Sequence, residues 1–357
     1  MAGHVSVLSL AVLVLATAVI AGEEVPGRWS AEQAKAWYEN QPWLAGFNYV
    51  PSSAINTTEI WQAETFDAAL IDRELALAQE LGFNTTRVFV QYLVWKHDPG
   101  GLKRRLDQFV AVADKRGLST MFVLFDDCKF SNKEPYLGKQ DDPVPGILGS
   151  GWTPSPGHVR VVDKAAWPDL EKYVVDVVGR FASDRRVVAW DLYNEPGNNG
   201  MGNKSLPLVE ACFAWARKAK PSQPLTIGVW NGGLGDLNKA QVELSDVVSF
   251  HNYGNLDAVK GQVAGFKAPN RPIICTEYMA RTIGSFFKTH MPWFKQERIG
   301  CYSWGLVNGK MQCQYPWSSK KGDPEPKLWH HDIFRKDGTP YDPDEVAFIR
   351  KFLRKQE

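Results

Sequence analysis

Short runs rich in valine, isoleucine and phenylalanine alternate with longer amphipathic segments from residue 45 onward, and this alternation most limits the possible folds. Eight runs fit β-strands, with expected bounds of 46–50, 86–90, 120–125, 187–193, 225–230, 247–252, 273–278 and 301–306. Strands that alternate with helical segments are typical of a parallel sheet. Eight such units predict an α/β fold, the (β/α)8 barrel, whose active site lies at the carboxyl ends of the strands.

The segments between these runs predict helices, as residues 66–81 illustrate. Ile71, Leu75 and Ala78 recur at spacings of three and four, charged residues lie between them, and Gly82 ends the pattern. Further helices are expected at 102–116, 167–181, 206–219, 256–266, 286–297 and 344–354. Long connections at 126–166 and 308–343 follow the third and eighth strands, and connections of such length are typically functional or disordered. Both are therefore expected at the catalytic end of the barrel.

The first 22 residues have the layout of a secretory signal peptide, because an apolar stretch from Val5 to Ile20 precedes small residues. This stretch is shorter than the roughly 20 apolar residues that a membrane span needs. A cleaved leader and a secreted or periplasmic protein are expected, with an uncleaved anchor as the alternative because no Lys or Arg precedes the stretch. Residues 23–357 then form a single barrel domain, since no linker, low-complexity tract or long repeat divides them.

Charge and cysteine content exclude several classes of protein. The 41 basic and 40 acidic residues give a net charge of +1 without a basic block, so nucleic acid is not an expected partner. The five cysteines show neither CxxC nor metal-ligand spacing, so no metal site is expected. Their odd number leaves at least one free thiol, and Cys275 and Cys301, on the last two strands, are expected to be buried thiols.

Tryptophan is the informative excess in this composition, with 14 residues. Sugar rings stack on such side chains, although core packing is the alternative role, which we expect for about half of the tryptophans near loops or strand ends. These are Trp61, Trp95, Trp152, Trp230, Trp304, Trp317 and Trp329.

Two glutamates stand at the ends of expected strands. Glu195 follows the run at 187–193, and Pro196 prevents that strand from continuing. Glu277 lies near the end of 273–278, three strands further around the barrel. Two carboxyl groups that face each other across a barrel mouth suit glycoside hydrolysis, in which one protonates the leaving oxygen and the other attacks the anomeric carbon. For each glutamate alone, a salt bridge at the rim is the alternative.

The segment WDLYNEP at 190–196 resembles the strand-four signature of glycoside hydrolase clan A, and TEY at 276–278 resembles its strand-seven nucleophile segment. The cellulase family, family five, is the most similar. FNTTRV at 83–88 resembles the strand-two arginine segment, HNY at 251–253 the strand-six His-x-Tyr, and Trp304 the strand-eight tryptophan beneath the sugar. The chain differs on strand three, where the family commonly has a histidine and residues 125–128 read FDDC.

The resemblance implies a glycosidase that cleaves β-linked glucan, mannan or related oligosaccharides with retention of configuration. Glu277 is the implied nucleophile, kept ionised by Arg87 and Tyr253, and Glu195 is the implied acid/base, kept protonated by the nearby charge of Glu277. Two carboxyl groups suffice for this reaction, so no cofactor is expected.

Four further residues have implied contacts with the substrate. Asn194 donates to the sugar 2-hydroxyl, and Trp304 lies beneath the sugar ring. His251 positions either the substrate or Tyr253, or equally is a hydrogen-bonded polar group at a strand end without a direct role. Asp126 accepts a hydrogen bond from a sugar hydroxyl or, equally, makes a structural hydrogen bond.

Two other functions fit the same residues. A non-catalytic barrel would bind carbohydrate through the same aromatic rim, but such a protein usually lacks one of the two glutamates. A transglycosylase shares the covalent intermediate and differs only in whether sugar or water accepts the glycosyl group. The long loops favour a terminal unit or a short oligosaccharide as substrate, because they can block one end of a groove.

Overall fold

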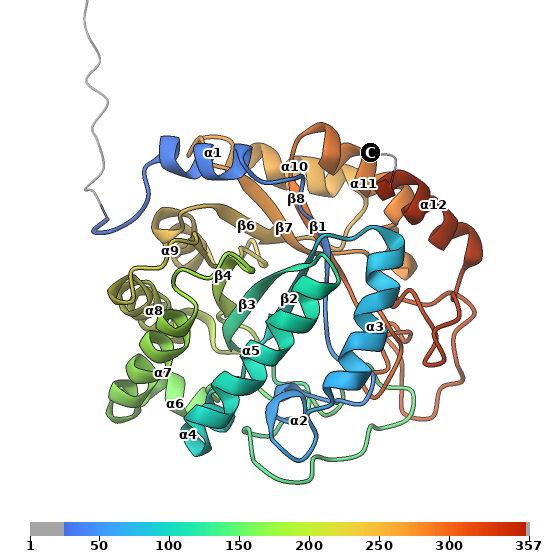
Figure 1. The fold of residues 1–357 in the computed structure, drawn as a ribbon, viewed down its shortest axis with the longest axis horizontal. Coiled ribbons are helices and arrows are strands. Elements are labelled where there is room, and N and C mark those ends of the chain that lie inside the picture. Colours follow the sequence, from blue (N-terminus) through green and yellow to red (C-terminus); the bar gives the residue numbers. More distant parts are fainter. Residues whose placement is uncertain (1–24, 355–357) are drawn as a thin grey trace, which may run out of the picture.

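The computed structural model describes residues 25–354, so the expected signal peptide lies outside the described residues. Within this range eight parallel strands are arranged in the order β5-β4-β3-β2-β1-β8-β7-β6 (Figure 1). A parallel bridge between Val229 and Phe250 joins the two ends of this order, so the sheet curves into a nearly closed barrel. The predicted (β/α)8 fold is confirmed. The strands are β1 Ala45–Asn48, β2 Thr85–Phe89, β3 Ser119–Asp126, β4 Val187–Asn194, β5 Leu225–Thr226, β6 Val248–His251, β7 Ile273–Tyr278 and β8 Gly300–Trp304.

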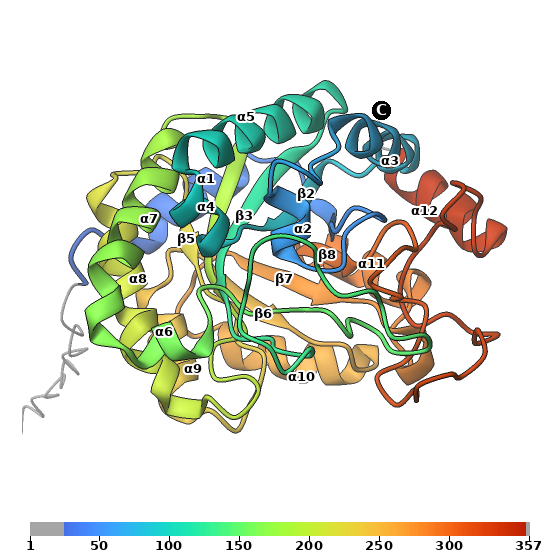
Figure 2. The ribbon, with the colours of Figure 1, turned by 90° about the horizontal axis from the view of Figure 1, so that it is seen from below.

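Helices surround the barrel (Figures 1 and 2). None of the helices in residues 25–354 has the length and apolar character needed to cross a bilayer. The α-helices are α1 Ala31–Glu39, α2 Thr57–Trp61, α3 Ala68–Leu81, α4 Tyr92–His97, α5 Pro99–Lys115, α6 His158–Val162, α7 Trp167–Arg180, α8 Leu206–Lys218, α9 Gly235–Leu244, α10 Leu256–Phe266, α11 Phe287–Gln296 and α12 Pro343–Arg354, with short 3-10 turns at Lys164–Ala166, Gly202–Ser205 and Arg281–Ile283.

Helix α3 shows how local sequence determines an element. The Asp67 side chain accepts a hydrogen bond from the backbone N–H of Leu70, which caps the first turn, and Gly82 ends the helix with a left-handed φ of 90°. Ile71, Leu75 and Ala78 are buried against the barrel, as their spacing predicted.

Strand β5 is shorter than predicted, with two residues where the sequence pattern indicated 225–230. Side chains from the following segment take the place of its ladder. Gln241 donates to the carbonyl of Gly228, and the backbone N–H of Ile227 donates to Ser245. The prediction of six residues at this position was therefore wrong.

The two long connections lie side by side at the carboxyl ends of the strands (Figure 2). The backbone N–H of Gly149, in the loop after β3, donates to the carbonyl of Met311, in the loop after β8, over 2.8 Å. Gln312 donates to the carbonyls of Val144 and Ile147 over 2.7 and 3.1 Å. The loops thus form one continuous wall on the side where the active site was expected.

Candidate active site

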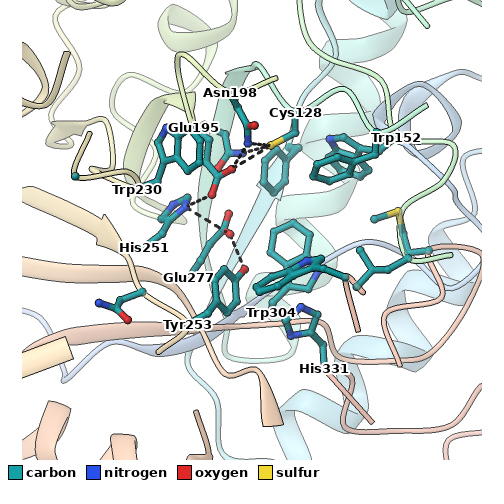
Figure 3. Close-up of a pocket in the computed structure, with 18 of the residues that line it drawn as sticks. Cys128, Trp152, Glu195, Asn198, Trp230, His251, Tyr253, Glu277, Trp304 and His331 are labelled. Carbon is teal, nitrogen blue, oxygen red and sulfur yellow. Dashed lines mark hydrogen bonds and ion pairs between the residues drawn. The ribbon is translucent and has the colours of Figure 1, made fainter. Parts of the chain in front are cut away.

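A cavity of about 600 Å³ lies at the carboxyl ends of the strands. Strand ends and both long loops provide its walls, and Figure 3 shows Glu195 and Glu277 facing each other across it. Its lining combines aromatic, aliphatic and polar side chains: Phe89, Cys128, Phe130, Leu148, Trp152, Asn194, Glu195, Asn198, Trp230, Gly232, His251, Asn252, Tyr253, Gln262, Glu277, Trp304, Met311, Trp317 and His331.

Glu195 directly follows β4 and has a left-handed φ of 41°. A non-glycine residue in this region costs on the order of 1–3 kcal/mol and persists only where surrounding contacts hold it. Three donors meet its carboxylate: Nδ1 of His251 lies 2.9 Å from Oε1, while Asn198 Nδ2 and Cys128 Sγ lie 2.6 and 3.3 Å from Oε2. The carboxylate is therefore held toward the cavity by contacts from three elements.

Glu277, on β7, is 4 % exposed and is held from below the cavity. Arg87 Nη1 donates to Oε1 over 2.8 Å, and the Tyr253 hydroxyl donates to Oε2 over 2.6 Å. Both oxygens thus have strong donors, one of which belongs to a permanent cation.

Arg87, on β2, is fully buried in the barrel beneath the carboxylates. Besides Glu277, its guanidinium donates to Asp191 over 2.7 Å, to Asn48 over 2.7 Å and to Asn194 over 2.7 Å. A buried guanidinium is stable only when its donors are matched in this way. Asp191 and Asn48, which our sequence analysis did not single out, lie on β4 and β1 and complete this network.

One oxygen of each glutamate and a ring nitrogen of His251 lie within 4.8 Å of one another. Retaining glycosidases place their carboxyl groups about 5–5.5 Å apart, whereas inverting enzymes need roughly 6.5–9.5 Å to admit a water molecule. Glu195 and Glu277 are thus close enough for the retaining arrangement.

A family model decides the membership of the chain: the model of Cellulase (glycosyl hydrolase family 5) matches residues 46–314. The chain belongs to glycosyl hydrolase family 5. This family 5 protein is thus a glycosidase that hydrolyses O-glycosyl compounds. No curated protein sequence matches it.

Solved structures share the fold of this family 5 enzyme at low identity. An exo-β-1,4-mannosidase of Opitutaceae bacterium strain TAV5 is 17 % identical with a TM-score of 0.60, over 87 % of this chain and 59 % of the other. An endo-1,4-β-D-mannanase of Thermotoga petrophila is 13 % identical with a TM-score of 0.56, over 87 % and 99 %. A GH5_18 protein of Streptomyces cattleya, in complex with Manb1-4GlcNAc, is 13 % identical with a TM-score of 0.57, over 87 % and 80 %.

The surroundings of the two glutamates shift their pKa values in opposite directions. Burial raises the pKa of Glu277, and this outweighs the lowering by His251 and Arg87. Burial also acts on Glu195, but hydrogen bonds from His251, Cys128 and Asn198 outweigh it and lower the pKa of Glu195. The two carboxyl groups titrate as a pair, and the donors around each one set the direction of its shift.

Asp126 lies behind the cavity wall and is not among the lining residues. Its carboxylate accepts hydrogen bonds from Trp152 Nε1 over 2.6 Å, Asn194 Nδ2 over 2.9 Å and the backbone N–H of Cys128 over 2.9 Å. Burial raises the pKa of Asp126 to about 7. Of the two roles expected for Asp126, this geometry fits the structural hydrogen bond, which orients Asn194.

Four of the seven tryptophans near loops or strand ends line the cavity: Trp152, Trp230, Trp304 and Trp317. The other three, Trp61, Trp95 and Trp329, are buried elsewhere. Trp317 is 52 % exposed and packs edge-on against Tyr253, with ring centroids 5.1 Å apart. About half of this set therefore packs in the core, as expected from the sequence.

All five cysteines lie in the described part of the chain, and each is a free, buried thiol there. The expectation for Cys275 and Cys301 is confirmed. Cys128 and Asn198 were not predicted as site residues, and the only sequence signal for Cys128 was the departure from the family pattern after strand three.

Glu195, His251 and Glu277 also form the one group within residues 25–354 in which His, Cys, Asp or Glu ligand atoms are close enough to share a metal ion. A cation at this position would compete with Arg87 and Tyr253, which already donate to both oxygens of Glu277. The arrangement is better suited to moving a proton between carboxyl groups than to binding a metal.

Proposed function

We propose that this family 5 enzyme cleaves β-glycosidic bonds with net retention by double displacement, with Glu277 as nucleophile and Glu195 as acid/base. The observation that carries this proposal is the closeness of the two carboxylates, since one oxygen of each lies within 4.8 Å of the other. This closeness favours the retaining arrangement over the wider one of an inverting enzyme.

In the first step, Glu277 attacks the anomeric carbon and forms a glycosyl ester, while Glu195 gives its proton to the departing oxygen. Arg87 and Tyr253 stabilise the attacking carboxylate, and Trp304 lies beneath the sugar ring. Asn194, held by Arg87 and Asp126, donates to the sugar 2-hydroxyl, a contact that strengthens in the transition state.

In the second step, Glu195 takes a proton from water, and the resulting hydroxide attacks the anomeric carbon and releases Glu277. Esterification removes the negative charge of Glu277, which favours the ionised form of Glu195 at this stage. Each glycosidic bond is thus exchanged for one molecule of water, and both carboxyl groups return to their first state.

The first step requires a proton on Glu195. His251 Nδ1 lies 2.9 Å from Glu195 Oε1 and 3.5 Å from Glu277 Oε2, so it bridges the two carboxyl groups. Of the donors to Glu277, Arg87 lies on β2 and Tyr253 lies two residues past β6, whereas Cys128 and Asn198, which donate to Glu195, lie in the loops after β3 and β4. A leaving-group oxygen seated against Glu195 competes with those loop donors, which favours protonation of Glu195.

The proposed substrates are β-linked mannosides, with action on a terminal unit or a short oligosaccharide. Relatives in fold include an exo-β-1,4-mannosidase and an endo-mannanase. The terminal mode rests on the wall formed by the two long loops, since Gln312 and Gly149 join them beside the cavity. A wall at this position limits the number of sugar units that can extend past Trp304 and Trp152.

The test is hydrolysis of a panel of aryl β-glycosides and β-1,4-linked manno- and gluco-oligosaccharides, with the anomeric configuration of the first product followed by NMR. We expect a β-configured first product, the highest rate on a mannoside, and release of single sugar units. An α-configured first product would exclude double displacement. A rapid fall in viscosity of a long mannan would exclude the terminal mode, and added acceptor sugars would detect transglycosylation.

A further inference from the structure

Cys128 occupies an unusual place for a thiol, directly beside the acid/base. It follows β3 by two residues, in the segment where the chain departs from the family pattern, and it lines the cavity. Its sulfur lies 3.3 Å from Glu195 Oε2 (Figure 3). The backbone N–H of Cys128 donates to Asp126, which fixes the position of the thiol relative to β3.

The neighbours of the Cys128 sulfur determine which group accepts its S–H hydrogen bond. Asn198 Nδ2 and Asn194 Nδ2 lie 3.4 and 3.6 Å from the sulfur and can only donate to it. Because the sulfur accepts hydrogen bonds from both amides, its own proton is donated to Glu195. Burial raises the pKa of Cys128 well above its ordinary value, so this proton is retained throughout catalysis.

We propose that Cys128 is a positioning residue for Glu195: its S–H group stabilises the ionised carboxylate weakly enough that Glu195 can still be protonated for the first step. A thiol is a weak donor, and a strong donor at this position would hold Glu195 ionised. The thiol also links Glu195 to Asn194, and thereby to the group that contacts the sugar 2-hydroxyl. This inference rests on the proposed function, in which Glu195 is the acid/base.

The titratable groups that face Glu195 come from several elements, and all of them influence its proton. They are Asp126 of β3, Cys128 of the following loop, His251 and Tyr253 at the end of β6, and Glu277 of β7. Replacing Cys128 alone leaves the other four in place, so a change in pH dependence in such a variant reports the thiol.

The experiment compares the wild type with Cys128→Ala and Cys128→Ser on two β-glycosides of the preferred sugar, with 4-nitrophenol and 2,4-dinitrophenol as leaving groups. Cys128→Ala removes the donor, so the alkaline limb of kcat/KM for the 4-nitrophenyl glycoside should move to higher pH. The kcat for the activated dinitrophenyl glycoside, which reports the second step, should fall about tenfold. Cys128→Ser keeps a donor that is stronger than the thiol, so it should restore most of this rate while the alkaline limb moves to lower pH.

Cys212→Ala is the matched control, because this thiol is also fully buried but lies on α8 away from the cavity. It should leave both pH profiles unchanged. Equal losses on both substrates without a displaced limb in Cys128→Ala would show a packing role and overturn the inference, as would an unchanged Cys128→Ala enzyme. Glu195→Ala separates the two proposals. If this variant remains fully active, the proposed function itself is wrong. If it loses activity while Cys128→Ala is unchanged, only the role of Cys128 is wrong.

Discussion

The two ends of the barrel have cavities of similar size, but the charged side chains are buried in one and exposed to solvent in the other. The cavity at the carboxyl ends of the strands measures about 600 Å³, and a second cleft at the amino ends of β7 and β8 measures about 520 Å³. Lys35, Lys267 and Arg298 are among the residues that line the second cleft. In the first cavity, Glu277 and His251 are each 4 % exposed, and Glu277 accepts a hydrogen bond from the fully buried Arg87.

This difference shows that buried, mutually compensated charge distinguishes the catalytic end better than volume does. Removing an ionised group from water is costly unless partners replace the lost hydration. At the carboxyl ends the chain provides these partners around Arg87, from β1, β4 and β7. At the amino ends the ion pair of Lys267 with Glu297 spans 3.6 Å, and its lysine side chain is 65 % exposed.

The largest effect is expected at Glu277, the proposed nucleophile. Glu277→Ala removes the carboxylate that is proposed to form the glycosyl ester, so kcat should fall by at least about 10⁴-fold, the scale on which loss of a covalent nucleophile is measured. Steady-state hydrolysis of the preferred aryl glycoside checks this. A variant with more than a tenth of the wild-type rate would show that another group attacks the sugar.

Arg87→Met should affect both activity and stability. It leaves Asp191 and Glu277 buried without their cation, which typically costs about 3–5 kcal/mol of unfolding free energy when one partner of a buried pair is removed. It also removes a group that lowers the pKa of Glu277, so the acid limb of kcat/KM should move to higher pH. Urea denaturation and pH-rate profiles measure these effects, and a stable variant with an unmoved acid limb would contradict the role of Arg87.

A smaller effect, on stability alone, is expected at Asp332. Burial raises the pKa of its carboxyl group to about 7. Its unfolded pKa is about 3.9, so the native state keeps a proton that the unfolded chain has lost. The protonated Asp332 contributes fully to the unfolding free energy below the unfolded pKa. This contribution disappears as pH rises toward 7, and the unfolding free energy falls by up to about 1.4 kcal/mol per pH unit. Asp332→Asn should flatten the fall of unfolding free energy between about pH 4 and pH 7, and an unchanged slope in denaturation curves would contradict this.

The smallest effect is expected at the other end of the barrel. Lys267→Ala removes an exposed charge from the second cleft, so the unfolding free energy should change by less than about 0.5 kcal/mol and kcat/KM should stay the same. The same assays as for Arg87→Met apply. A clear loss of activity would break the contrast between the two ends and indicate that the second cleft takes part in function.

The barrel and the core of the site could be predicted because both depend on local patterns. The alternation of runs indicates the strands, and residues at strand ends reach the same rim. Glu195 and Glu277 were found in this way, and Tyr253 through the family resemblance of residues 251–253; the structure brings the three together.

The rest depends on contacts between distant segments. Strand β5 is short because Gln241 and Ser245 take its hydrogen bonds, and nothing in residues 225–230 indicates this. Asn198 meets Glu195 because Asp127 holds the turn after β4 through the backbone N–H of Gly197. The opposite pKa shifts of Glu195 and Glu277 likewise depend on burial and on the donors around each carboxylate, which no motif records.

Trapping the intermediate tests the central claim most directly. A 2-deoxy-2-fluoro β-glycoside of the preferred sugar with a good leaving group should slow the second step and leave the sugar attached to the enzyme, since the fluorine weakens the oxocarbenium-like transition state. We predict a stoichiometric adduct that peptide mass spectrometry locates at Glu277 and that Glu277→Ala does not form. An adduct on another carboxylate, or turnover without any adduct, would contradict the assignment of Glu277 as nucleophile.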